Sequence, residues 1–362
     1  MSICGIARQF LLSSVIALTL APAILAQTSR PTIFASGFNN PRGLKFGPDG
    51  NLYVSEGGAG GATSTQGVCR QVPAPVGPYT GGFTGRISKV TPAGTVTTVA
   101  DHLPSDQTSA AQGNLVSGVA DVAFIGHTLY ALLAGAGCSH GLVGTNNGIL
   151  RVNPDGSTTM VTNLSRFLKN NPVANPNPGD FEPDGTWYSM VEAYGVLFAI
   201  EPNHGELDAI WPGAFIQRIA DISATQGHIV PTAIAFNGAD FFVGNLDTFP
   251  IKDGSSKVMK ITPLGELTTV YINLSDIVGL AFDKKGRLYV LENTTGNQFP
   301  TPGTGMILRV DGKNNYKEIA TGLSLPTAMT FGPDGNLYVS NLGFGPPPVG
   351  AGQILKVVVP AD

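Results

Sequence analysis

The sequence predicts an all-β protein, a six-bladed β-propeller closed by an N-terminal strand that completes the last blade. The same ten residues, FGPDGNLYVS, occur at Phe46–Ser55 and again at Phe331–Ser340. Pro-Asp-Gly favours a tight turn, and the aromatic and β-branched residues after it favour a strand. The chain contains 47 Gly and 27 Pro and is only 13% charged, a composition typical of a turn-rich β fold.

The strand within this phrase recurs along the chain as a repeat. Its six copies begin at Asn51, Thr128, Val196, Asp240, Arg287 and Asn336. The last three steps between copies are 44, 47 and 49 residues, which is typical of one propeller blade per copy. The first two steps are longer and indicate insertions. Each copy has a predicted strand before it and another after it, so each unit provides most of one blade.

The two ends of the chain are predicted to meet in one blade. Five units have a predicted fourth strand, but the sixth reaches Asp362 without one. An unassigned strand, TIFASGF at Thr32–Phe38, precedes the first unit. We expect it to complete the last blade, which closes the ring and removes exposed sheet edges. Residues 27–362 then form one propeller without an internal boundary, with a short helical turn around Ser165–Asn170.

Residues 1–26 resemble a secretory signal peptide. Arg8 is their only charged residue, and the apolar run at Phe10–Ala26 is short for a membrane span. The small residues near its end predict cleavage after Ala26, with cleavage after Ala23 or an uncleaved anchor as alternatives. We therefore expect a secreted protein, extracellular or periplasmic.

The long connections are predicted to gather on one face of the ring. Neighbouring strands of a blade run in opposite directions, so loops after each second strand and loops between blades share a face. All the long connections belong to this set, which we call the long-loop face: Gly57–Gly85, His102–Ser117, Ala134–Asn147 and Arg166–Gly185. Long loops on one side of a rigid scaffold indicate a binding face, here for a small molecule, a glycan or a protein.

Two cysteines, Cys69 and Cys138, remain after the predicted cleavage, and both lie on the long-loop face in neighbouring blades. In an exported protein an isolated pair favours one disulfide, here between blades one and two. Two buried thiols are the alternative.

The charge pattern argues against two classes of partner. The net charge is −4 and no basic run or stripe occurs, so we expect no nucleic-acid partner. No second long apolar stretch occurs, so we expect no membrane association once the signal peptide is removed. The expected assembly is a monomer.

Candidate binding residues come from aligning the second strands of the six units. The position five residues after each strand start holds Glu56, Leu133, Glu201, Asn245, Glu292 and Asn341. We expect the polar members, with Arg42, to form a ligand site at one mouth of the central channel. One Ca²⁺ or similar divalent ion is an alternative, with Glu56, Glu201 and Glu292 as candidate ligands. The other alternative is that these side chains only bond backbone N–H groups and channel water, with no cofactor.

Two shorter motifs receive weaker assignments. DFEPDG at Asp180–Gly185 partly resembles a calcium loop but lacks the final glutamate at the required spacing, so we expect a solvated acidic loop. GCSHG at Gly137–Gly141 matches G-x-S-x-G, but no helix pattern follows it, so we assign no catalytic residue there. Four histidines map to the long-loop face with no acid placed beside them, and each is expected at the surface: His102, His140, His204 and His228.

Longer motifs resemble the ScyD/ScyE family of exported propellers, named for proteins encoded with the cyanobacterial scytonemin pathway. The resemblance rests on NPRGLKFGPDGNLYVSEGG at Asn40–Gly58, followed by GRISKV, and on GAGCSHG with TNNGILRVNPDG. GDFEPDGTWYSMV and EPNHGELD at Glu201–Asp208 extend it over nearly the whole mature chain. The resemblance implies an extracellular six-bladed propeller of NHL-like type, without a defined molecular activity.

A wider resemblance is to gluconolactonase-type propellers, which bind a divalent metal at the channel. There an Asn in a Pro-Asn-Gly motif is a ligand, but this chain has Pro41-Arg42-Gly43, with Thr232 and Thr327 at analogous places. A cationic Arg42 disfavours a metal and suits Glu56, Glu292 or an anionic ligand. We therefore expect a secreted binding or accessory protein rather than an enzyme. A metal-dependent hydrolase or lyase of lactonase type is the alternative, and a structural envelope protein is a third.

Overall fold

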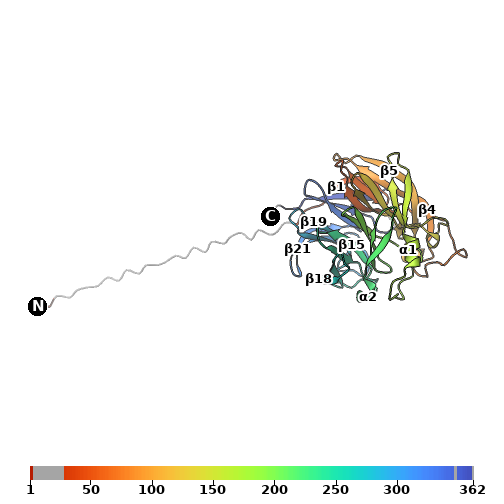
Figure 1. Cartoon of the computed structure of the whole chain (residues 1–362). Helices are drawn as coiled ribbons and strands as arrows, with labels where there is room; N and C mark the ends of the chain where they lie inside the picture. The colour runs from red at the N-terminus through yellow and green to blue at the C-terminus, as the bar shows by residue number, and fades with distance from the viewer. Residues whose placement is uncertain (3–27, 346–348, 361–362) are drawn as a thin grey trace.

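The computed structural model describes residues 1–2, 28–345 and 349–360, so the predicted signal peptide lies outside the described residues apart from its first two. Six antiparallel sheets form a ring (Figure 1), which confirms the predicted six-bladed propeller. No helix within the described ranges is long and apolar enough to cross a membrane.

The first three blades carry the longest connections. Blade 1 contains β2 (Pro41–Phe46), β3 (Leu52–Glu56), β4 (Thr80–Val90), β5 (Val96–Gln107) and β6 (Val116–Ser117). Blade 2 contains β7 (Val119–Ile125), β8 (Thr128–Leu133), β9 (Gly148–Val152) and β10 (Thr158–Asn163). Blade 3 contains β11 (Ser189–Ala193), β12 (Val196–Glu201), β13 (Glu206–Ile210) and β14 (Ile216–Asp221).

The remaining blades are more regular. Blade 4 contains β15 (Pro231–Phe236), β16 (Phe241–Asn245), β17 (Ser256–Ile261) and β18 (Leu267–Leu274). Blade 5 contains β19 (Ile277–Phe282), β20 (Leu288–Glu292), β21 (Gly305–Gly312) and β22 (Asn315–Leu323). Blade 6 contains β23 (Ala328–Phe331), β24 (Leu337–Asn341), β25 (Gly352–Val357) and the N-terminal β1 (Thr32–Phe38).

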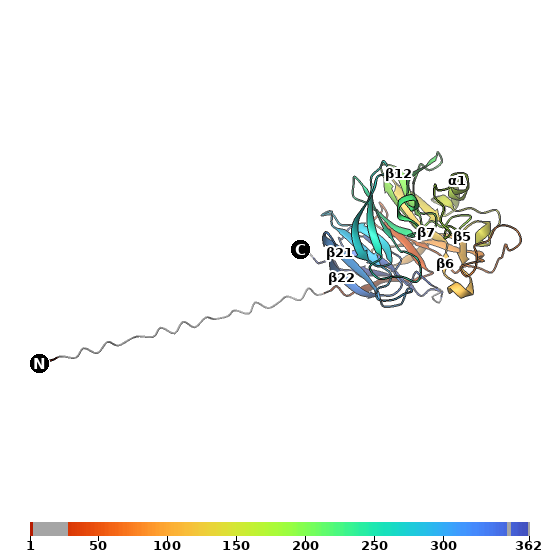
Figure 2. The same cartoon turned by 90° about the horizontal axis from the view of Figure 1, so that it is seen from below.

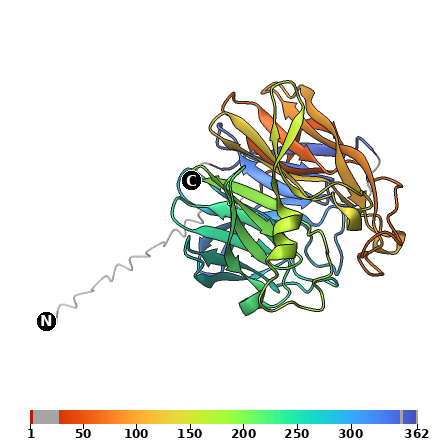
Figure 3. The same ribbon diagram turned by 45° about the vertical axis from the view of Figure 1, so that its right-hand side comes forward.

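The ring closes as the sequence predicts. β1 pairs antiparallel with β25, from Thr32 opposite Lys356 to Phe38 opposite Gly352. Figure 3 shows the red and orange N-terminal strands beside the blue C-terminal strands. Because the first described strand is the outer strand of the last blade, unravelling either end would open the ring.

Aromatic contacts between neighbouring blades explain the repeated phrase. Tyr53 of β3 stands edge-on to Phe124 of β7, with ring centroids 5.0 Å apart. The equivalent pairs of later blades have the same separation: Phe242–Phe282, Tyr289–Phe331 and Phe46–Tyr338. At these four junctions an aromatic residue on a second strand therefore packs against an aromatic residue on the neighbouring blade's first strand, an arrangement favoured by the ring quadrupoles.

Short helices lie only in the connections. The predicted turn around 165–170 is α1 (Leu164–Asn170), capped by the Asn163 side chain and labelled in Figure 2. The others are α2 (Ser223–Gln226), η1 (Ala110–Gln112) and η2 (Cys138–His140).

The predicted loops of blade 1 need a correction. Residues 80–85 and 102–107 are not loop, because β4 and β5 continue through them as one long hairpin with Thr80 opposite Gln107. The short β6 then pairs with the end of β5 and makes this sheet five-stranded. Backbone pairing therefore stiffens a part of the long-loop face that the sequence suggested was irregular.

Candidate functional site

A small cavity of about 50 Å³ lies at the mouth of the central channel. Residues at or near the start of the innermost strands of several blades line it. Its polar side chains are those of Arg42, Ser117, Asp121, Thr186, Tyr188, Ser189 and Thr327. The loops that lead into these strands belong to the long-loop face. The volume holds a few water molecules or one small polar group, not a whole sugar.

Arg42 is the cation of this cavity. Its guanidinium donates to the carbonyl of Val116 and lies 5.9 Å from the ring centroid of Tyr188. Burial lowers its pKa, while Tyr188 and Asp106 act in the opposite sense. Arg42 remains half-buried and makes no ion pair with any carboxylate in residues 28–345 or 349–360.

The two carboxylates suggested as partners of Arg42 are occupied elsewhere. Glu56 forms an ion pair with Arg86 at 2.8 Å, and Glu292 accepts a hydrogen bond from the backbone N–H of Ser275 at 2.7 Å. Arg42 therefore keeps donor capacity toward the cavity.

Asp121 is the one carboxylate among the described residues lining this cavity, and it is engaged by the backbone. Its oxygens accept hydrogen bonds from the N–H groups of Val122 and Met190, both at 2.8 Å. It lies so close to Gly43 that a β-carbon built there would stand 1.8 Å from Asp121 Oδ1. Burial raises the pKa of Asp121. Only glycine fits opposite this carboxylate.

The predicted column of carboxylates and amides is buried one strand away from the cavity. Its members end the second strands, and within the described chain Arg42 alone of the predicted set lines the cavity. Four of them accept a backbone N–H where their own blade begins, in the pairs Glu56–Asn39, Glu201–Thr186, Glu292–Ser275 and Asn341–Ser324 at 2.7–2.9 Å. Such bonds to backbone N–H groups are one of the alternatives expected from the sequence for these side chains. A role in ligand binding stays a prediction.

The other two members of the column differ. Asn245 accepts from the N–H of Lys257 and donates to the carbonyl of Ile229, so it joins the start of β17 to the connection before β15. Leu133 has no polar group and makes no such side-chain bond, while the N–H of Ala134 donates to the carbonyl of Gly118 as the N–H of Gly57 does to that of Asn40.

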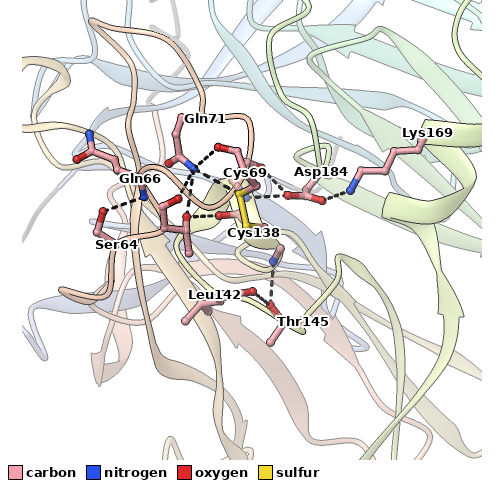
Figure 4. The surroundings of a disulfide bond; sticks show 12 residues. Ser64, Gln66, Cys69, Gln71, Cys138, Leu142, Thr145, Lys169 and Asp184 are labelled. Carbon is pink, nitrogen blue, oxygen red and sulfur yellow. Dashed lines mark hydrogen bonds and ion pairs between the residues drawn. A yellow bond between two sulfur atoms is a disulfide. The ribbon is translucent and has the colours of Figure 1, made fainter.

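The predicted disulfide between blades 1 and 2 is present in the structure. The sulfurs of Cys69 and Cys138 are 2.08 Å apart, with 6.3 Å between the α-carbons. Around the bond, Thr65 donates to the Cys138 carbonyl, and Gln71 donates to the carbonyls of Thr65 and Cys69. Figure 4 shows Gln71 beside the two cysteines. The bond fastens the connection after β3 to the one after β8.

A buried ionic network lies under these loops, where the sequence suggested surface residues. His140 Nδ1 is 2.9 Å from Asp106, and Nε2 is 3.1 Å from the carbonyl of Gly185. Glu182 lies 3.9 Å from Nε2 and accepts a hydrogen bond from Tyr79 at 2.5 Å. Burial alone would lower the pKa of His140, but Asp106, Glu182 and Asp184 raise it to about 9.

The acidic loop at 180–185 is therefore not solvated, which corrects the expectation from its sequence. Glu182 and Asp184 are 3% and 4% exposed. Asp184 accepts hydrogen bonds from the Ser139 hydroxyl at 2.7 Å and from Lys169 at 2.5 Å (Figure 4). Burial would raise the pKa of Asp184, but these hydrogen bonds hold it below its ordinary value. Ser139 thus has a structural partner rather than a catalytic one.

Three histidines besides His140 also lie beside an acid. His204 Nδ1 is 3.2 Å from Glu201, and His228 Nδ1 is 3.0 Å from Asp180. His102 pairs with Asp101 at 2.8 Å and is exposed, so it alone is confirmed as a surface residue. Neither buried acid could be recognised from the sequence, because Asp106 lies on β5 and Glu182 in the connection before β11, both far along the chain from His140.

Solved structures share this fold at low sequence identity. A Thermus thermophilus protein described as an oxidoreductase (glucose dehydrogenase) aligns with a TM-score of 0.56 at 16% identity, covering 91% of this chain and 100% of its own. A gluconolactonase from Xanthomonas campestris aligns at 0.54 and 13%, covering 93% and 94%. A further glucose dehydrogenase aligns at 0.53 and 14%, covering 91% and 100%.

No protein-family model and no curated protein matches the sequence. At these identities the likeness establishes the propeller fold alone, and the activities of those proteins do not transfer with it.

Proposed function

We propose that this chain is an exported binding or accessory protein of the ScyD/ScyE type that captures a small anionic ligand at its long-loop face. The observation that carries the proposal is the half-buried guanidinium of Arg42. It lines the cavity but forms no ion pair with a carboxylate of the described residues. A partly buried cation without an anion is unfavourable, and a bound carboxylate would satisfy it with charge-assisted hydrogen bonds.

Other groups of the cavity suit an oxygen-rich ligand. Trp187 lines the cavity, and its indole N–H has no acceptor in the described structure. The hydroxyl of Tyr188 donates to the carbonyl of Thr327 and lies beside the guanidinium of Arg42. Since about 50 Å³ accommodates little more than a carboxylate, we expect the rest of the ligand to lie on the surrounding loops.

The rigidity of the loops also supports a binding role. The Cys69–Cys138 bond and the His140 network fix three connections before any ligand arrives, which reduces the entropy lost on binding. A disulfide is consistent with an oxidising compartment and agrees with the predicted export.

The test is binding of matched acids and neutral sugars by calorimetry. We expect glucuronate and gluconate to bind, with glucose and methyl glucoside much weaker. Arg42→Gln should weaken glucuronate binding more than tenfold, and Arg42→Lys should restore part of it. Arg151→Gln is the control, because Arg151 is exposed on β9 away from the cavity. Equal affinity of the wild-type protein and Arg42→Gln would contradict the proposal.

The same protein samples can be tested for lactonase activity. We expect no turnover of gluconolactone with added calcium, because Arg42 is cationic and the one carboxylate among the described lining residues, Asp121, is bonded to backbone N–H groups. Calcium-dependent turnover that Arg42→Gln leaves unchanged would favour the hydrolase alternative.

A further inference from the structure

The turn between β12 and β13 brings metal-ligating groups together in blade 3. Glu201 ends β12 and lies directly opposite Glu206, which begins β13, while His204 stands in the turn between them. One ligand atom from each of these three residues lies within 4.8 Å of the others. The sequence EPNHGELD at Glu201–Asp208 therefore folds into a compact donor set that the channel site does not use.

An unsatisfied buried carboxylate accompanies this set. Asp208 follows Glu206 on the same face of β13, is fully buried, and has no hydrogen-bond partner at either oxygen. Glu206 Oε1 is also without a partner, although its other oxygen accepts from Arg218. A buried carboxylate without a donor is strongly unfavourable, so the pocket requires either a proton or a cation.

We propose that blade 3 holds one divalent transition-metal ion of the zinc type, bound by Glu201, His204, Glu206 and Asp208. One imidazole with carboxylates is a donor set of zinc and its neighbours, whereas calcium and magnesium prefer oxygen alone. The charges also agree, because three carboxylates and Arg218 leave two negative charges that a divalent ion neutralises.

The ligand distances require only a small closure. Four donors at about 2.1 Å from a tetrahedral zinc lie about 3.4 Å from one another. The donor atoms of Glu201, His204 and Glu206 now lie within 4.8 Å of one another, so these three side chains would move inward by roughly an ångström. Asp208 would close on them from the next position on the same face of β13. His204 is the access route, since its side chain is 17% exposed while the three carboxylates are buried.

The ion would have a structural consequence for the long-loop face. Glu201 Oε1 accepts a hydrogen bond from the backbone N–H of Thr186, while Oε2 faces His204. Asn203 in the same turn accepts from the backbone N–H of Glu182 and donates to the carbonyl of Gly179. A metal that fixes this turn would therefore fix the segment carrying the cavity wall. The site is nevertheless separate from the cavity, because none of its four ligands lines it.

The test uses the purified mature chain, stripped with a chelator and then titrated with Zn²⁺, Co²⁺, Mn²⁺, Ca²⁺ or Mg²⁺. We expect one Zn²⁺ or Co²⁺ per chain by elemental analysis, a visible absorption band on Co²⁺ binding, and a rise in Tm. Affinity should follow the order Zn²⁺ and Co²⁺ above Mn²⁺. Absence of stoichiometric binding, or a rise in Tm with Ca²⁺ and Mg²⁺ only, would overturn the assignment.

Two variants and a matched control place the ion. His204→Gln should lower Zn²⁺ affinity more than tenfold, and Asp208→Asn should do the same while folding at least as stably without metal, because it removes the unsatisfied carboxylate. His228→Gln is the control, since His228 pairs with Asp180 at 3.0 Å and is equally exposed but has no third ligand. The proposal fails if His204→Gln binds Zn²⁺ as tightly as His228→Gln does.

Discussion

Phe46 and Tyr338, one from each copy of the ten-residue phrase, stand edge to face with their ring centroids 5.0 Å apart. The first belongs to blade 1 and the second to blade 6, so the contact lies where the ring closes. Tyr338 also meets Phe34 of β1 at 5.0 Å. The two copies of the phrase therefore meet across the junction that closes the ring.

We predict a measurable coupling between these two rings. Phe46→Leu and Tyr338→Leu should each destabilise the protein by about 1–3 kcal/mol, because each loses apolar contact and the aromatic pair. In a double-mutant cycle by urea unfolding, the coupling should be about 0.5–1.5 kcal/mol. The hydroxyl of Tyr338 takes no part in the ring contact and donates a hydrogen bond to Asp334 at 3.1 Å. Tyr338→Phe removes this hydrogen bond and keeps the ring contact, so it measures the contribution of the hydroxyl separately. A coupling of zero would mean that the rings merely fill space.

The second prediction separates charge from hydrogen bonding in the column of buried carboxylates. Glu292→Ala should cost about 1–3 kcal/mol, since the buried N–H of Ser275 loses its acceptor. Glu292→Gln should cost much less, because Asn341 performs the same task for Ser324 with an amide oxygen. Burial raises the pKa of Glu292 to about 7, so loss of its charge at neutral pH is inexpensive.

Unfolding by urea at pH 7 measures both variants, and Asn341→Ala provides the matched comparison. Should Glu292→Gln prove as damaging as Glu292→Ala, the negative charge itself would be needed, and the ligand-binding interpretation of the column would gain support.

The sequence predicted the fold closely because its information is local and repeated. Turn residues before each second strand, the blade period, and the unpaired strand at Thr32–Phe38 each indicate the same ring, and β1 begins and ends at the predicted residues. The disulfide could also be predicted, because Cys69 and Cys138 fall in long connections of neighbouring blades.

The site could be predicted only in part. Alignment correctly placed Glu56 and its equivalents at the ends of the second strands, but these strands lie one position outward from the channel, so first-strand residues such as Arg42 line the cavity instead. The network around His140 could not be found from spacing, because its acids Asp106 and Glu182 are 34 and 42 residues away along the chain, on β5 and in the connection before β11. Only the assembled ring brings them together.

The third prediction concerns the Cys69–Cys138 bond. Replacing both cysteines by serine should lower the free energy of unfolding by about 2–4 kcal/mol, since the bond restricts a long segment of the unfolded chain. Urea unfolding with and without a phosphine reductant measures the effect. The reductant should bring the wild-type protein to the stability of the variant and leave the variant unchanged. A fully reduced wild-type protein, verified by thiol titration, with unaltered stability would contradict the prediction.

The last prediction is a pH dependence of stability caused by His140. Its pKa is about 9 in the folded protein against an ordinary value of 6.5, since Asp106, Glu182 and Asp184 outweigh the effect of burial. Tyr79, the remaining titratable group packed on the ring, has a pKa raised well above its ordinary value and stays neutral. Folding therefore favours protonated His140. Its stabilisation is complete below about pH 6.5 and is lost as the pH rises through about 9, with a slope approaching about 1.4 kcal/mol per pH unit.

Urea unfolding of the wild-type protein and His140→Gln between pH 7 and 9.5 measures this effect. The difference between their free energies of unfolding should shrink steadily over that range. A difference that stays constant over that range would show that His140 is neutral in the folded protein and that Asp106 holds it by a neutral hydrogen bond.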